Sequence, residues 1–138
     1  MNFEHVGWAV NSIEGAESAL NALEFERCGN ITEDASRRVR ILLMQNRNGT
    51  IVELVAPLGE GKNPVSNFLA KNGPSPYHCC FSANKYDAEQ TISRLKQAGF
   101  KMLIPPSPAP ALKDDEVVFL YSKDVGIVEL VLRESSTW

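Results

Sequence analysis

The stretch Ile51–Val55 reads IVELV, and the same five letters return as Ile127–Val131. Such residues are common in β-strands, so five matching positions alone could arise by chance. The match extends upstream, however, because the chain has only two histidines and each precedes one copy. His5 lies 46 positions before the first copy and His78 lies 49 positions before the second. The sequence therefore predicts two related modules in tandem.

The first module reads as strand, helix and three strands. An apolar strand opens it, and a helix follows with its apolar residues at helical spacing and Asn11 or Ser12 as the N-terminal cap. Asn48-Gly49 favours a tight turn between the last two strands. The strands predicted in this module span residues 3–10, 25–28, 39–45 and 50–55.

The second module has the same order of elements. Its helix is predicted to begin at about Tyr86 and to end at Gly99. The run Pro105–Pro110 contains four prolines, which lack the N–H that a strand or helix interior needs, so a stiff loop is predicted there. That loop is either a spacer or a segment that flanks the substrate. The strands predicted in this module span residues 77–83, 101–104, 116–121 and 126–132.

Together these patterns predict one α+β domain over residues 1–138. Module one covers about 1–57 and module two about 75–133. A connecting helix is expected at about 63–73, where Asn63 can cap it and Pro64 suits its first position.

The composition limits the class of protein. Apolar residues make up 43% and charged residues 22%, which is typical of a globular protein. The net charge of −3 disfavours a nucleic-acid partner. No apolar run approaches the ~20 residues of a membrane span, and the first residues lack the layout of a signal peptide. Three cysteines form neither a disulfide framework nor a metal knuckle, so a reduced, cytoplasmic protein is expected.

The two repeated glutamates suggest a buried site. Side chains alternate along a strand, so Glu53 shares a face with Ile51 and Val55, and Glu129 has matching apolar neighbours. Burying a carboxylate on such a face is costly unless it is paired or bound to a cation. The alternative is that both glutamates face solvent while the intervening apolar residues face the core.

The favoured interpretation is a divalent metal held by His5, Glu53, His78 and Glu129. Two imidazoles and two carboxylates suit Zn, Mn, Fe, Co or Ni. A single histidine or glutamate in a strand is usually an ordinary surface or core residue, so the matched positions carry the argument. Cys80 shares the face of His78 and either lines the site or is a small buried side chain.

At these residues the chain resembles the vicinal oxygen chelate superfamily, which contains glyoxalase I, methylmalonyl-CoA epimerase, extradiol dioxygenases and bleomycin-resistance proteins. Among these groups, the sequence resembles the methylmalonyl-CoA epimerases most. The resemblance implies paired βαβββ modules in a curled eight-stranded mixed sheet around a central metal. It places ligands on His5, His78 and Glu129, with Glu53 as the fourth, and it suggests a homodimer. The stretches that carry it include residues 5–10, 52–58, 63–69, 77–78, 95–99, 117–120 and 126–130.

One departure concerns the proton-transfer base. The epimerases carry a glutamate just before the strand that begins here at Val39, whereas this chain has Ala35–Arg38 there. Glu33 and Asp34 are near but offset. The family base therefore has no direct match.

The resulting hypothesis is a metal-dependent isomerase, epimerase or lyase that acts on a carbon beside a carbonyl through a metal-stabilised enolate. The base would be Glu129 or Glu53, if one of them loosens from the metal, or the unmatched Glu33. The substrate would be an acyl-CoA or another small carbonyl compound. Basic side chains that could meet a phosphate, or could simply be solvated, are Arg37, Arg38, Arg40 and Lys62.

Two alternatives stay open. A non-haem iron dioxygenase of the extradiol type needs open positions on the metal, which a fourth ligand at Glu53 would reduce. A metal-free protein that binds a small molecule, as bleomycin-resistance proteins do, would not need four matched ligands.

Overall fold

The computed structural model describes residues 1–134 and confirms the α+β class, with helices and strands in the predicted order. The chain forms two compact units. The N-terminal unit is His5–Tyr77. The C-terminal unit consists of Met1–Glu4 and the residues from His78 onward. The first strand therefore contributes residues to both units.

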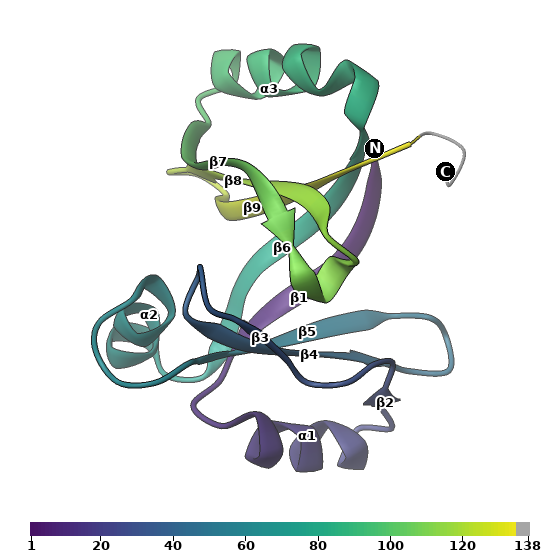
Figure 1. Cartoon of the computed structure of the whole chain (residues 1–138), viewed down its shortest axis with the longest axis vertical. Helices are drawn as coiled ribbons and strands as arrows, with labels where there is room; N and C mark the ends of the chain where they lie inside the picture. Colours follow the sequence, from purple (N-terminus) through teal and green to yellow (C-terminus); the bar gives the residue numbers. More distant parts are fainter. Residues whose placement is uncertain (135–138) are drawn as a thin grey trace. The chain divides into compact units, whose positions relative to one another are not determined.

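In the N-terminal unit, four strands follow the order β2-β4-β5-β1, and β3 pairs with β4 (Figure 1). β1 runs parallel to β5, and β4 is antiparallel to β5, β2 and β3. The elements are β1 (Asn2–Ala9), α1 (Ile13–Ala22), β2 (Glu26–Arg27), β3 (Thr32–Asp34), β4 (Val39–Gln45), β5 (Ile51–Pro57) and α2 (Pro64–Asn72).

The C-terminal unit repeats this pattern with the strand order β6-β9-β8-β7. β6 runs parallel to β9, and β8 is antiparallel to β9 and β7. The predicted repeat is therefore present in the strand pairing of both units. The elements are β6 (Ser75–Asn84), the 3-10 turn η1 (Lys85–Asp87), α3 (Ala88–Gln97), β7 (Lys101–Ala109), the 3-10 turn η2 (Pro110–Leu112), β8 (Asp115–Ser122) and β9 (Gly126–Arg133).

Each unit packs its main helix on one face of its strands. In the N-terminal unit, Leu54 of β5 and Leu42 of β4 pack with Ile13 and Leu20 of α1. In the C-terminal unit, the even-numbered core residues of β8 and β9 pack with Ile92 and Leu95 of α3. The odd-numbered residues of β4, β5, β8 and β9 therefore point to the opposite face of their unit. We call this opposite face the ligand face of each unit.

The helix ends follow the predicted caps. Ser12 rather than Asn11 caps α1, because its side chain accepts a hydrogen bond from the backbone N–H of Gly15. Asn63 and Ser66 cap α2 reciprocally, with Pro64 at its first position. Gly99 follows α3 with a φ of 100°, a backbone conformation that favours glycine. None of the helices in residues 1–134 is long and apolar enough to cross a bilayer.

The prediction of a loop over Pro105–Pro110 is wrong for most of this segment. β7 continues through Ala109, and only Pro110 belongs to the following 3-10 turn. Proline is tolerated because β7 ends the strand order of its unit and pairs with β8 through two register shifts. Such irregular edge strands need fewer N–H donors than a central strand does.

The structure also holds nine strands within the described residues, where the sequence predicted eight. The additional strand is β3, which pairs with Ile41, Arg40 and Val39 of β4. It is short and polar, so it carries no hydrophobic period that a sequence pattern could reveal. The strand predicted over 25–28 shortens to the two residues of β2.

Candidate metal centre

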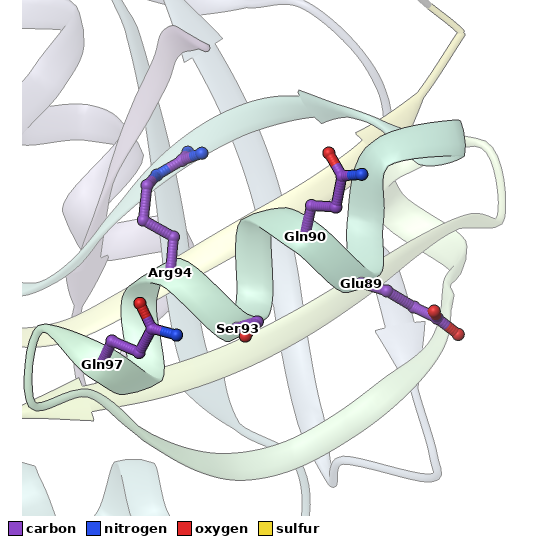
Figure 2. Close-up of a pocket in the computed structure, with 5 residues that line it drawn as sticks. All are labelled: Glu89, Gln90, Ser93, Arg94 and Gln97. Atoms are coloured by element: carbon purple, nitrogen blue, oxygen red, sulfur yellow. The ribbon is translucent and has the colours of Figure 1, made fainter.

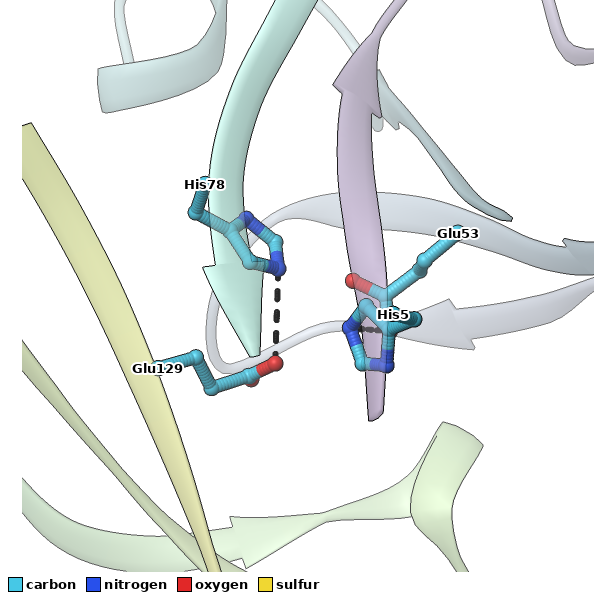
Figure 3. Close-up of side chains that lie close together, drawn as sticks. All are labelled: His5, Glu53, His78 and Glu129. Carbon is cyan, nitrogen blue, oxygen red and sulfur yellow. Dashed lines mark ion pairs between the residues drawn. The ribbon is translucent and has the colours of Figure 1, made fainter. Parts of the chain in front are cut away.

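The N-terminal unit brings His5 and Glu53 together on its ligand face. β1 and β5 are parallel and place Gly7 beside Glu53, and His5 lies two residues before Gly7 on the same face. The distance between His5 Nε2 and Glu53 Oε2 is 3.5 Å, and each side chain is 4% exposed. Figure 3 marks this contact with a dashed line.

The C-terminal unit builds a second pair in the same way. β6 and β9 are parallel and place Cys80 beside Glu129, with His78 two residues before Cys80. The distance between His78 Nε2 and Glu129 Oε1 is 3.3 Å (Figure 3). Both side chains are buried. The alternative in which the repeated glutamates face solvent is therefore wrong.

These two pairs carry the chemistry of a divalent metal site. His5, Glu53, His78 and Glu129 each offer one ligand atom, and all four are buried. Two imidazole nitrogens and two carboxylate oxygens suit first-row divalent ions, and two carboxylates balance the charge of a dication. Buried carboxylates need such compensation, so the donor set fits a cation.

Two neighbouring side chains flank the C-terminal pair. Cys80 lies on the ligand face opposite Glu129 and is fully buried, as its shared face with His78 predicted. Its thiol donates to the backbone carbonyl of Phe81 over 3.8 Å. Phe119 lies on the other side of Glu129, and its ring packs edge-to-face with the His78 imidazole. Sequence reasoning missed Phe119, although the offset of 76 residues that relates the two glutamates also relates it to Leu43.

The register argues against Glu33 as a base near Glu53. Glu33 pairs with Arg40, and Arg40 pairs with Ala56. Ala56 belongs to the core under α1. Glu33 therefore lies on the helix face of the strands, whereas Glu53 lies on the ligand face.

Asp34 does lie on the ligand face, but other groups hold its carboxylate. It accepts hydrogen bonds from Ser36 Oγ at 2.8 Å, from the Arg37 backbone N–H at 3.1 Å and from Arg37 Nη1 at 2.8 Å. Burial by itself raises the pKa of Asp34, but the hydrogen bonds from Arg37 and Ser36 outweigh it and hold the pKa below its usual range. Asp34 is thus a stabilised anion and a poor base.

The basic residues that could have met a phosphate have partners within the N-terminal unit. Arg37 pairs with Asp34. Arg38 donates to the backbone carbonyls of Glu60 and Lys62. Arg40 donates to Glu14 over 3.1 Å. These contacts account for the three arginines as structural groups, and Lys62 is exposed.

A surface hollow on the outer side of α3 is distinct from the two pairs (Figure 2). All of its lining residues come from this one helix, and none is a candidate metal ligand. It gathers no combination of groups with evident catalytic chemistry. The lining residues are Glu89, Gln90, Ser93, Arg94 and Gln97.

Comparison with known proteins finds one matching protein family and a similar epimerase. The sequence model of the Glyoxalase/Bleomycin resistance protein/Dioxygenase superfamily matches residues 4–119. The chain is 31% identical over 129 residues to the ethylmalonyl-CoA/methylmalonyl-CoA epimerase of Cereibacter sphaeroides. This alignment covers 91% of the present chain and 93% of that protein.

Solved structures share the fold. Methylmalonyl-CoA epimerase from Mycobacterium tuberculosis matches with a TM-score of 0.80 and 21% identity, over 99% of this chain and 90% of that one. A variant of the Streptomyces coelicolor methylmalonyl-CoA epimerase, in complex with 2-nitronate-propionyl-CoA, matches with a TM-score of 0.77 and 23% identity, over 98% of both chains. At these identities the similarity shows the fold alone, and it agrees with the fold that the sequence predicted.

Proposed function

The chain belongs to the glyoxalase/bleomycin resistance/dioxygenase superfamily, and we propose that it is an epimerase that inverts a carbon beside the carbonyl of an acyl-CoA. The support is the similarity to a curated epimerase, which extends over nearly the whole of both chains. The prediction of an enzyme of the glyoxalase superfamily is confirmed by the family match and by the epimerase that is 31% identical to the chain. The acyl-CoA substrate and the metal are parts of the proposal.

In this proposal, His5, Glu53, His78 and Glu129 would together hold one divalent ion: Zn, Mn, Co, Ni or Fe. The observation that carries it is the matched pair of buried His–Glu contacts, at 3.5 and 3.3 Å. When bound, such an ion supplies positive charge that stabilises the oxyanion formed as a proton leaves the carbon beside a carbonyl.

The proton itself would be moved by a carboxylate of the chain. Glu53 and Glu129 are the proposed catalytic residues, because Glu33 lies on the other face and Asp34 is held by Arg37. Epimerisation requires a proton to leave one side of the carbon and to return to the other. The repeat gives the chain two matched carboxylates for these two transfers, and each would have to leave the ion before it could take the proton.

Solvent isotope exchange tests this function. The metal-loaded protein is incubated in D₂O with each epimer of methylmalonyl-CoA or ethylmalonyl-CoA. We expect inversion together with incorporation of deuterium at the carbon between the two carbonyl groups. Glu33→Gln is the matched control and should retain full activity, because Glu33 lies on the helix face. Inversion and exchange that are both absent, with every metal tested, would contradict the proposal.

Elemental analysis separates the rival functions. Iron together with oxygen consumption would favour the dioxygenase, and an ion-free protein that still binds small molecules would favour the binding protein. The burial of Glu53 beside His5 supports a four-ligand centre over the three-ligand dioxygenase site. The homodimer stays a prediction, and a monomer in light scattering at high concentration would contradict it.

A further inference from the structure

An aromatic ring packs directly on one of the candidate ligands. The centroids of the Phe119 and His78 rings are 5.6 Å apart, and the ring planes meet at 88°. This edge-to-face geometry is preferred between aromatic rings because the positive edge of one ring meets the electron-rich face of the other. The contact therefore favours one orientation of the imidazole over the alternatives.

The same ring stands beside the second ligand of the unit. Phe119 on β8 is directly opposite Glu129 on β9, and side chains at such positions have Cβ atoms about 5 Å apart. Val118 and Leu120 point into the core under α3, so Phe119 points to the ligand face with Glu129. Phe119 thus touches the imidazole and flanks the carboxylate that lies 3.3 Å from it.

The N-terminal unit has no ring at the matching position. The residue opposite Glu53 on β4 is Leu43. Leucine supplies an apolar neighbour of similar size, but it lacks the flat electron-rich face that orients an imidazole. The two units therefore differ in how strongly the neighbouring strand constrains the ligand pair.

We propose that Phe119 is a positioning residue, which holds the His78 imidazole with Nε2 directed toward Glu129 so that both can bind one divalent ion. The inference rests on the proposed metal centre and adds a residue that binds no metal itself. Groups that fix the orientation of a metal-binding histidine strengthen metal affinity, because the ligand loses less freedom on binding. Phe119→Leu should therefore weaken metal binding even though volume and apolarity are nearly kept.

Calorimetric titration of the metal-free protein with Co²⁺ measures this role. We expect Phe119→Leu to weaken Co²⁺ binding by about 2- to 10-fold, the range that an aromatic pair accounts for. Phe119→Tyr keeps the ring, and its added hydroxyl can reach solvent because residue 119 is only partly buried, so affinity should stay within about twofold. Leu43→Val is the matched control in the N-terminal unit and should change affinity by less than Phe119→Leu does.

Histidine NMR of the metal-free protein provides a second readout. The chain has only two histidines, so ¹³C-labelled histidine gives one set of ring signals for His78 and one for His5. The ring current of Phe119 should shift the His78 signals in the unsubstituted protein and in Phe119→Tyr. Phe119→Leu should lose this shift, and the His5 signals should stay in place as an internal control. If Phe119→Leu does not fold, Phe119→Met removes the ring with a more adaptable side chain.

The results of these experiments distinguish a failure of the positioning role from a failure of the metal centre. Equal Co²⁺ affinity in Phe119→Leu, or an equal loss in Phe119→Tyr, would overturn the positioning role while leaving the metal centre intact. Unchanged His78 signals in Phe119→Leu would show that the ring contact is absent and would overturn the inference at its first step. No Co²⁺ binding by the unsubstituted protein would overturn the metal centre, and the positioning role with it.

Discussion

The N-terminal and C-terminal units hold a histidine and a glutamate in the same way but surround them differently. In both, parallel strands place the pair on one face, at 3.5 Å in one unit and 3.3 Å in the other. Beside Glu53 the neighbouring strands supply Gly7 and Leu43. Beside Glu129 they supply Cys80 and Phe119. The repeat therefore keeps the histidine and the glutamate of each unit, whereas the residues beside the glutamate differ.

A second difference lies further along the ligand face. The N-terminal unit has the Asp34–Arg37 ion pair, in which the Asp34 side chain is 3% exposed. The C-terminal unit has Arg133 paired with Asp115 and Glu4, and the Asp115 side chain is 36% exposed. Both units thus carry an Arg–Asp pair, but the carboxylate is buried only in the N-terminal unit. Buried and exposed pairs differ strongly in what they contribute to stability, so the two units can be separated experimentally.

The largest expected effect is on turnover. Glu53→Gln and Glu129→Gln should each lower turnover by about 10²- to 10⁴-fold, the loss typical of removing a general base. Steady-state kinetics on both epimers measures this effect. A loss at only one position would assign the proton transfer to a single unit. Full activity in both variants would remove the two glutamates from the catalytic machinery.

The next effect is on stability. Asp34→Asn should lower the free energy of unfolding by about 3 kcal/mol, because it leaves the Arg37 guanidinium without its buried carboxylate. Asp115→Asn should cost at most about 1 kcal/mol, because solvent screens that pair. Urea denaturation of the two variants gives the comparison. Equal losses would show that burial does not distinguish the two pairs.

The pH dependence of stability sharpens the same contrast. The folded-state pKa of Asp34 is lowered, so its carboxylate stabilises the fold above the unfolded pKa of about 3.9. That contribution is lost as the pH falls through the lower folded pKa. The difference in unfolding free energy between the unsubstituted protein and Asp34→Asn should therefore be full at pH 6 and shrink below about pH 4. A difference that stays constant down to pH 2.5 would contradict this role.

The smallest expected change in stability concerns the N-terminal caps of the two main helices, α1 and α3. The side chain of Ser12 caps α1, whereas Asp87 makes no side-chain cap at the start of α3. Ser12→Ala should cost about 1 kcal/mol of unfolding free energy, and Asp87→Ala should cost less. Thermal denaturation measures both. A larger loss for Asp87→Ala would show that the two helix starts are stabilised in another way.

Much of this architecture could be predicted from the sequence, because it depends on local periodicity. The repeat of IVELV and the alternation of side chains identified the strands and the face of Glu53 and Glu129. Ser12, Asn63 and Gly99 mark helix ends through chemistry that is local to a few residues. These features need no knowledge of which strand pairs with which.

The features that the sequence did not predict depend on which strands pair with one another. β3 forms only because β4 is beside it, and its register is what places Glu33 on the helix face. β7 accommodates its prolines because it pairs irregularly with a single strand of its unit. Phe119 joins the candidate site through its position across from Glu129. The domain boundaries, the homodimer and the cytoplasmic location stay predictions.

The proposed function requires the two His–Glu pairs to bind one metal ion together. Metal content per chain, measured by elemental analysis after dialysis, tests it most directly in the unsubstituted protein, His5→Ala and His78→Ala. We predict one divalent ion per folded chain in the unsubstituted protein and an affinity more than about 100-fold weaker in either variant, because each histidine supplies a direct ligand. Circular dichroism should show that both variants stay folded. One full equivalent of tightly bound metal in both folded variants would contradict this requirement.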